Sequence, residues 1–324
     1  MAESSARRTA LFGIVATAAV ASLCAALPWL GVSAYLRTLL YYGAYYLALG
    51  QAWNLMSGLT GYVSFAHGAL AGIGAYAVVI AMNAGLPLWL SLLCAAATTA
   101  LASLVIGLTS LRLRGTAFTF ATLFFQELVL LIVRKLPFVG GPGGIVLEEI
   151  LPAWLPYLLM LGVAAGATML LLVIRRTRTG LRILALKDDE AAANAAGINA
   201  TRLKLILFCV SAAIAGATGA VHGLFASSLF PNVVFAVDLS IVALAVPLIG
   251  GAGTASGPVV GALLYVVIRE VLQVIAPGMH LTIVGLVLLI VILFLRDGVV
   301  VALARAIRHR RALPPALAIG PEPR

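Results

Sequence analysis

The chain has 324 residues, of which 63% are hydrophobic and only 10% are charged, and its mean hydropathy is +1.12. A soluble domain is about 45–50% apolar and about 25% charged, so this composition excludes a soluble protein and predicts a polytopic membrane protein. The net charge of +10 does not indicate nucleic-acid binding, because the basic residues cluster beside apolar segments, as cytoplasmic membrane anchors do.

Apolar segments of roughly twenty residues, the length that crosses a ~30 Å hydrocarbon core, recur along the chain. They predict about ten spans, near residues 11–30, 36–57, 62–82, 88–110, 116–134, 153–174, 203–225, 238–252, 258–275 and 280–295. With the N-terminus inside, alternation of the spans places most of the 21 Lys and Arg residues on the cytoplasmic side. We therefore expect an all-α integral membrane protein with both termini in the cytoplasm: a tail at 1–10, one transmembrane domain at 11–296, and a basic, Pro-rich tail at 297–324. The basic tail is expected to touch anionic lipid.

Two segments combine Gly and Ala at close spacing: GLTGYVSFAHGALAGIGAY at 58–76 and GGAGTASGPVVGALLY at 250–265. In lipid, such small residues let helix backbones approach closely. Their weak likeness suggests two related halves, as in many transporters. Two roles are open for these segments: ordinary tight packing of helices, or the lining or gating of a translocation path. The candidate packing or gating positions are Gly58, Gly61, Gly68, Gly72, Gly250, Gly251, Gly253, Gly257 and Pro258.

Polar residues inside spans are costly and usually face a cavity or a partner. Glu127 lies mid-span without a neighbouring cation. Two roles are open for it: lining a translocation path, or making an interhelical hydrogen bond that fixes the packing. Asp238 begins a span, where capping of the helix is the favoured interpretation, and Arg269 with Glu270 is expected to form an interfacial pair. The candidates for a translocation path are Gln51, Asn54, Ser64, His67, Glu127 and Asp238.

The loop 175–204 is the only long polar insertion in the chain. Within it, residues 188–196 predict a short helix: Asp188 or Asp189 can cap it, acidic residues occupy its first turn, and Gly197 stands where a left-handed residue ends a helix. So short a helix would be marginal alone in water. We therefore expect a surface helix that is presented at the membrane face to another protein.

The sequence lacks motifs for ATP hydrolysis, metal binding and serine-hydrolase catalysis. No lysine lies in a P-loop, so the chain cannot hydrolyse ATP by that route. No histidine or cysteine pair has metal-ligand spacing, and there is no G-x-S-x-G motif. The sequence therefore predicts no metal, no cofactor and no enzyme activity.

Several blocks together resemble branched-chain amino acid ABC transporter permeases of the LivM type. These blocks are the 58–76 segment, LRLRGTAFTFATLFFQEL with VGGPGGI (111–128 and 139–145), the stretch 176–223, and DLSIVALAVPLIGGAGTASGPVVGALL (238–264). They run in order through most of the chain. Asp188, Asp189 and Glu190 depart from the Arg/Glu-rich opening usual in the third block, and Pro247 replaces a β-branched residue.

The resemblance implies a permease subunit of an importer in the bacterial inner membrane. It implies a second related permease, two cytoplasmic ATPase subunits and an extracytoplasmic substrate-binding protein as partners. It also implies that the loop 175–204 receives the ATPase. The candidate ATPase-coupling residues are Lys187, Asp188, Asp189, Glu190, Ala191, Ala192, Gly197 and Asn199. Two alternatives stay open: a urea or amide permease of the same family, and an ion-coupled secondary transporter.

Overall fold

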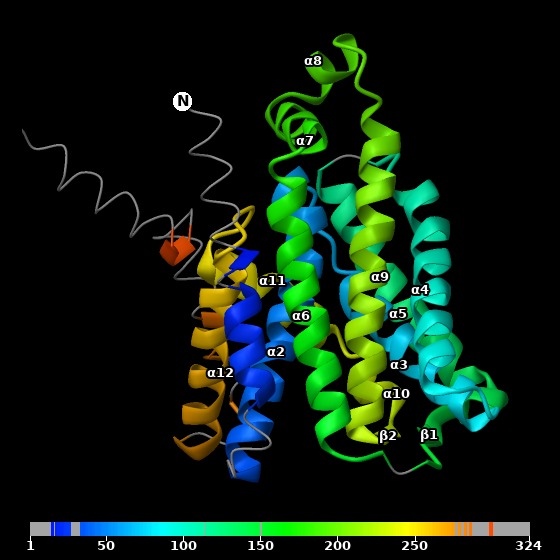
Figure 1. Cartoon of the computed structure of the whole chain (residues 1–324). Helices are drawn as coiled ribbons and strands as arrows, with labels where there is room; N and C mark the ends of the chain where they lie inside the picture. The colour runs from blue at the N-terminus through cyan, green and yellow to red at the C-terminus, as the bar shows by residue number, and fades with distance from the viewer. Residues whose placement is uncertain are drawn as a thin grey trace, which may run out of the picture.

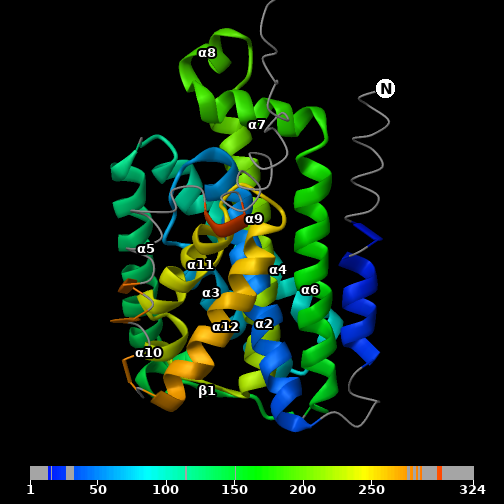
Figure 2. The same ribbon diagram turned by 90° about the vertical axis from the view of Figure 1, so that its left-hand side faces the viewer.

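The computed structural model describes residues 33–275 apart from positions 114 and 150, and residues 14–26 apart from position 16. It also describes the stretches 278–279, 282–283, 285–286 and 298–300. Over these residues the chain is a bundle of long helices that run side by side (Figures 1 and 2). Six described segments are long and apolar enough to cross a membrane. The prediction of an all-α, multi-pass membrane protein is thus confirmed.

The long helices are α2 (Ala34–Trp53), α3 (His67–Asn83), α4 (Leu88–Ser110), α5 (Thr116–Lys135), α6 (Trp154–Ile174), α9 (Ala200–Ala226), α11 (Val237–Gly250) and α12 (Gly257–Ile275). A shorter apolar helix, Thr17–Ala26, precedes them. Each predicted span from 36–57 to 258–275 therefore contains one helix. The predicted tail 1–10 lies outside the described residues, as do nearly all of the span 280–295 and of the tail 297–324, so the number of ten spans stays a prediction.

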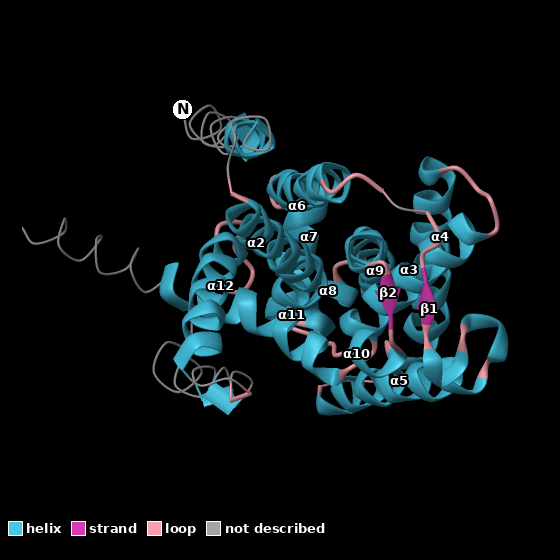
Figure 3. Cartoon of the chain, turned by 90° about the horizontal axis from the view of Figure 1, so that it is seen from below, coloured by secondary structure: helices cyan, strands magenta, loops and turns pink. Residues whose placement is uncertain are grey.

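Short elements occupy the two ends of the bundle. At one end, α7 (Arg178–Asp188) and α8 (Glu190–Ala195) project beyond the long helices (Figure 1). The other end carries η3 (Pro137–Val139), η4 (Gly141–Gly143), β1 (Ile145–Val146), β2 (Ser228–Leu229) and α10 (Pro231–Val234). The two strands pair antiparallel, with Ile145 opposite Leu229, and Figure 3 shows this end from below. The pairing ties the loop after α5 to the end of α9.

The span predicted at 62–82 begins later than expected, because α3 starts only at His67. Before it, α2 continues as a π-helix, η2 (Asn54–Gly58), and residues 61–64 are not helical. The Ser64 carbonyl accepts a hydrogen bond from the Trp53 indole at 2.9 Å, and the Ser64 amide donates to the Ser57 hydroxyl at 3.2 Å. Irregular backbone within a membrane protein requires such internal partners, so this segment is held by the neighbouring helix.

Helix α3 packs against α9 and α4 and is buried along most of its length. A Cβ atom at Gly74 would collide with the backbone of Gly216, and one at Gly219 with the carbonyl of Ala71. The small residues of α3 and α9 therefore bring the two backbones into direct contact, as expected for helices that associate in lipid. On the other side of the bundle, α2 packs against α6, α11 and α12.

Candidate functional site

The projecting end of the molecule contains the short capped helix that the sequence predicts. The Asp189 carboxylate accepts hydrogen bonds from the amides of Ala191 (2.8 Å) and Ala192 (3.0 Å) and so caps α8. Gly197, just beyond the helix, has a φ of +83°. Asp188 is not the cap: it is the last residue of α7. The exposed residues of α8 are Ala191, Ala192, Asn194 and Ala195.

The preceding helix, α7, was not predicted. Thr177 caps it by accepting a hydrogen bond from the amide of Gly180 at 3.4 Å. Ile183 and Leu186 face the bundle and are buried, while Leu181 is 67% exposed. The spacing of Ile183 and Leu186 is the helical signal in the sequence, but four arginines around it make the stretch resemble a cytoplasmic anchor. Leu184 of the same helix is also exposed, at 47%.

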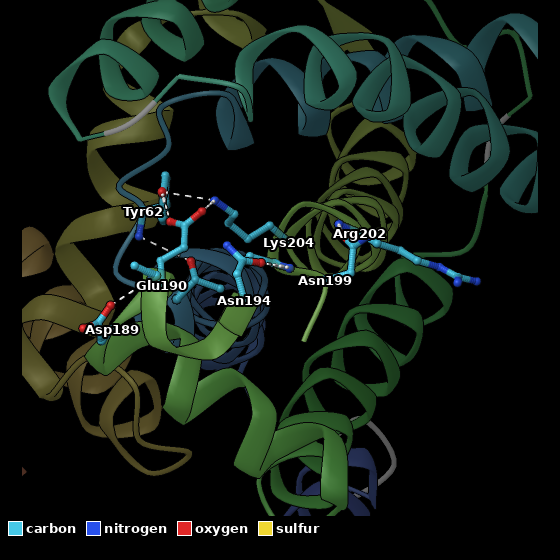
Figure 4. A network of polar contacts seen from close by, with 10 residues as sticks. Tyr62, Asp189, Glu190, Asn194, Asn199, Arg202 and Lys204 are labelled. Carbon is cyan, nitrogen blue, oxygen red and sulfur yellow. Dashed lines mark hydrogen bonds and ion pairs between the residues drawn. The ribbon is translucent and has the colours of Figure 1, made fainter. Parts of the chain in front are cut away.

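A buried ion pair holds α8 on the bundle (Figure 4). The Lys204 Nζ atom lies 2.8 Å from the Glu190 Oε1 atom, and the Lys204 side chain is only 2% exposed. The Tyr62 hydroxyl donates to the other carboxylate oxygen at 2.6 Å and accepts from Lys204 at 3.1 Å. The Lys204 ammonium also lies 4.2 Å from the centre of the Tyr62 ring. Because the three residues come from α8, α9 and the loop before α3, the network connects the projecting helix to two spans.

Outside this network, Asn199 caps the first turn of α9 by accepting from the amide of Arg202 at 2.9 Å. The Asn194 side chain of α8 accepts from the amide of Ala200 at 3.2 Å. The turn between α8 and α9 is therefore fixed by two side-chain hydrogen bonds. A displacement of α8 is expected to be transmitted to α9 rather than absorbed by this turn.

A second connection runs from α7 to both glycine-rich segments. The Lys187 Nζ atom donates to the Gly58 carbonyl at 3.0 Å. The Asn54 side chain, one turn earlier in η2, accepts from the amide of Gly253 at 2.7 Å and donates to the Thr254 carbonyl at 2.8 Å. A Cβ atom at Gly253 would also lie 2.9 Å from the Gly58 carbonyl oxygen, so the two glycine-rich segments meet directly. The projecting end contacts this junction through Lys187.

The predicted glycine positions lie mainly at close contacts. A Cβ atom at Gly68 would collide with Ser240, and one at Gly72 with the Phe235 ring. Gly250 faces the Gly257 carbonyl, which leaves no space for a side chain. Pro258 is buried in the first turn of α12. Three further predicted positions, Gly61, Gly251 and Gly253, have positive φ.

The predicted path residues do not form one group. Four of them, Gln51, Asn54, Ser64 and His67, are buried. Gln51 donates to the Ala255 carbonyl at 2.9 Å, and a nitrogen of His67 lies 3.3 Å from the Ser211 hydroxyl. Their contacts show packing positions, and a role on a path stays a prediction.

The two acidic candidates lie elsewhere. Glu127 lies on the exposed side of α5, so none of the described helices encloses it. Asp238 does not cap α11: the capping position is Ala236, and Asp238 lies in the first turn of the helix. The Asp238 side chain lines a cavity instead. The expected ion pair of Arg269 with Glu270 is present, at 3.7 Å.

This cavity opens near α10, at the end of the bundle opposite α7 and α8. Its volume is about 380 Å³, and it is bounded by α2, α3, α9, α10, α11 and α12. Three tyrosines of α2, Tyr265 and Arg269 of α12, and His222 of α9 are among its lining residues. Sequence reasoning did not predict this group, since its members come from helices far apart in the chain.

Comparison with known proteins identifies similar sequences. The family described as "Branched-chain amino acid transport system / permease component" matches residues 35–292. A protein of Salmonella typhimurium, the high-affinity branched-chain amino acid transport system permease protein LivM, is 29% identical over 264 residues, or 70% of this chain. The LivM protein of Escherichia coli is 29% identical over 268 residues. The chain spans 61% of the length of each of these relatives. No solved structure matches the chain.

Proposed function

The chain belongs to the branched-chain amino acid transport system permease family, and from this premise we propose that it is the membrane-spanning subunit of an ABC importer. It is a multi-pass protein of the bacterial inner membrane. The proposed substrates are branched-chain or related hydrophobic amino acids. The resemblance of the sequence to LivM supports this substrate class, because the names of both relatives specify branched-chain amino acids.

We propose the same partners that the resemblance implies: a second related permease, two cytoplasmic ATPases and an extracytoplasmic binding protein. The proposed ATPase contact is the projecting pair α7 and α8, with Lys187 to Asn199 as its centre. One observation carries this assignment. The projecting pair has an exposed outer surface, yet its inner side is fixed to the spans by Glu190, Lys204 and Lys187. A partner that moves α8 therefore moves the bundle.

The proposed mechanism is alternating access. Closure of the ATPases displaces α8 as a rigid unit, because its capped ends and its buried ion pair resist local unfolding. Lys187 transmits the displacement to the junction of η2 with the 251–256 loop. The tightly packed glycines then let helices slide without a change of side-chain packing. Asn54, a candidate path residue, lies at this junction. Its contacts are therefore expected to change when the junction moves.

We further propose about ten spans with two related halves, both termini in the cytoplasm, and a single transmembrane domain from 11 to 296 between the two tails. The likeness between the glycine-rich segments at 58–76 and 250–265 supports the two halves. This topology puts α7 and α8 on the cytoplasmic side and the cavity on the outer side.

A reconstitution experiment tests the proposed function against the two alternatives. The chain is placed in proteoliposomes with its candidate permease partner, ATPases and binding protein, and uptake of labelled leucine and urea is measured. If the chain is part of an importer, uptake requires ATP and continues in the presence of an uncoupler. A secondary transporter predicts uptake that collapses with the uncoupler and persists without the ATPases. Uptake of urea in preference to leucine would identify an amide permease.

A further inference from the structure

The cavity at the outer end of the bundle has the size of a small-molecule site. Its volume of about 380 Å³ lies in the range of roughly 300–1,000 Å³ that is typical of ligand pockets. Most of its wall is apolar or aromatic. Tyr265 is only 2% exposed, and its ring packs edge-on against that of Tyr46 with 4.7 Å between the ring centres. This part of the wall is therefore a packed aromatic surface, of the kind that an apolar side chain can contact.

Two opposite charges face this apolar wall. The Arg269 guanidinium lies over the Tyr42 ring, 4.8 Å from its centre. Its nearest carboxylate is Glu270, at 3.7 Å, which is too long for a strong hydrogen bond. The donors of Arg269 are therefore incompletely satisfied by the part of the chain that the structure describes. Arginine binds carboxylates through two parallel hydrogen bonds, and no other residue type does so as well.

Asp238 supplies the negative charge. Its carboxylate makes no hydrogen bond or ion pair with any described residue, although it lines the cavity. Asp238, Arg269 and the buried Tyr265 all line this cavity. The two charged groups therefore face one space beside a buried tyrosine. An ionised group within a span normally faces a water-filled cavity or a binding partner.

From this arrangement we infer that the cavity binds a zwitterionic amino acid with an apolar side chain. The α-carboxylate is bound by Arg269, the α-ammonium by Asp238, and the side chain lies against the tyrosines and aliphatic residues of α2, α3 and α11. The inference rests on the proposed function, and it adds a binding site within the permease itself. A neutral molecule such as urea would leave both charges without a partner, so the cavity selects against the amide alternative.

Ligand analogues test the two charge contacts separately. The full complex in lipid nanodiscs, without the external binding protein, is titrated with labelled leucine. The same preparation is then titrated with leucinamide, which lacks the carboxylate, and with 4-methylpentanoate, which lacks the ammonium group. The variants are Arg269→Gln and Asp238→Asn. Gln273→Ala is the control, because Gln273 is an exposed residue of the same helix and does not line the cavity.

We expect each variant to weaken leucine binding by roughly ten- to a hundredfold, the effect of losing one charged hydrogen bond. Arg269→Gln should also abolish the preference for leucine over leucinamide, and Asp238→Asn the preference for leucine over 4-methylpentanoate. These paired effects distinguish a lost contact from a misfolded cavity, since misfolding would weaken all ligands alike. The control Gln273→Ala should bind leucine as the wild type does.

Two results overturn the inference. One is a wild-type complex that binds no leucine at millimolar concentration. The other is that Arg269→Gln and Asp238→Asn both bind leucine with the affinity of the wild type, or both discriminate between leucine and its analogues as the wild type does. ATP-driven uptake by the intact importer is measured in parallel. If that uptake persists in either case, the proposed function stands and only the site within the membrane is rejected.

Discussion

The Nζ atom of Lys187 lies 3.0 Å from the carbonyl oxygen of Gly58, so the projecting helix pair is hydrogen-bonded to the π-helical end of α2. A Cβ atom built on Gly253 would also lie 3.7 Å from the same Lys187 Nζ. One lysine therefore contacts the place where the two glycine-rich segments meet. If the proposed mechanism holds, this contact carries part of the motion from the ATPase to the spans.

Replacing Lys187 by Met is expected to weaken this transmission without preventing assembly. Loss of a charged hydrogen bond corresponds to about 1.5–3 kcal/mol, or roughly a tenfold effect or more on a coupled step. We predict that ATPase subunits still co-purify while ATP-driven uptake falls by about that factor. The matched control is Lys135→Met, the same substitution at an exposed lysine of α5. Equal uptake by the two variants would contradict the role of Lys187.

The network of Glu190, Lys204 and Tyr62 is expected to contribute to stability. Replacing Lys204 by Met leaves the Glu190 carboxylate without its cation, and breaking a buried pair costs about 3–5 kcal/mol. Because Glu190 is 22% exposed, water compensates in part, and we predict a loss of about 2 kcal/mol in the free energy of unfolding. Tyr62→Phe removes two hydrogen bonds, one donated to Glu190 and one accepted from Lys204, and should cost about 1–2 kcal/mol.

Chemical denaturation of the purified complex measures both effects. Adding Glu190→Gln to Lys204→Met should recover part of the lost stability, because the unpaired charge is then removed. The contrary result is additivity: Glu190→Gln would lower the stability of the Lys204→Met variant by as much as it lowers that of the wild type. In that case the two residues do not interact as the structure indicates.

Much of this projecting end is predictable from the sequence, and the rest has identifiable physical reasons. The two ends of α8 can be predicted from Asp189 and Gly197, because helix caps are formed by residues that are close together in the sequence. The role of Lys204 is not predictable in this way, since its partner Tyr62 is 142 residues away. Similarly, Glu127 was expected inside the bundle, but the side of α5 on which it lies depends on which helices surround α5. The cavity joins six helices, so no local pattern indicates it.

The stability of the network should also depend on alkaline pH. Burial of the Tyr62 hydroxyl and its hydrogen bond to Glu190 raise the pKa of Tyr62 above its ordinary value of 10.0, against the opposing effect of Lys204. A raised pKa contributes stability that is present below the unfolded value and is lost as pH rises through the folded value. We therefore predict no change from this group at neutral pH and a loss above about pH 10.

Limited proteolysis of the 189–199 segment as a function of pH can follow this loss. Tyr62→Phe removes the titrating hydroxyl, so the difference between wild type and variant isolates its contribution. If the two proteins become susceptible to cleavage at the same alkaline pH and to the same degree, the tyrosine does not stabilise the network.

Gly250 provides a test of the close helix packing. A methyl group at this position would meet the Gly257 carbonyl, so Gly250→Ala is expected to force α11 and α12 apart and to destabilise the protein by about 1–3 kcal/mol. The control is Gly162→Ala in α6, where a Cβ atom meets nothing within 4 Å. There the same substitution should be neutral or stabilising by about 0.5–1 kcal/mol. Thermal unfolding in detergent compares the two, and equal effects would contradict the packing argument.

The central claim is that an ATPase drives this bundle through the exposed side of α8. Its most direct test is ATP-dependent leucine uptake by the complete complex with Ala192→Trp, a bulky substitution on that side, compared with Thr201→Trp, an exposed position at the start of α9. The account predicts that Ala192→Trp loses both bound ATPase and uptake while Thr201→Trp retains them. Undiminished ATP-driven uptake by Ala192→Trp, with the ATPase still bound, would contradict it.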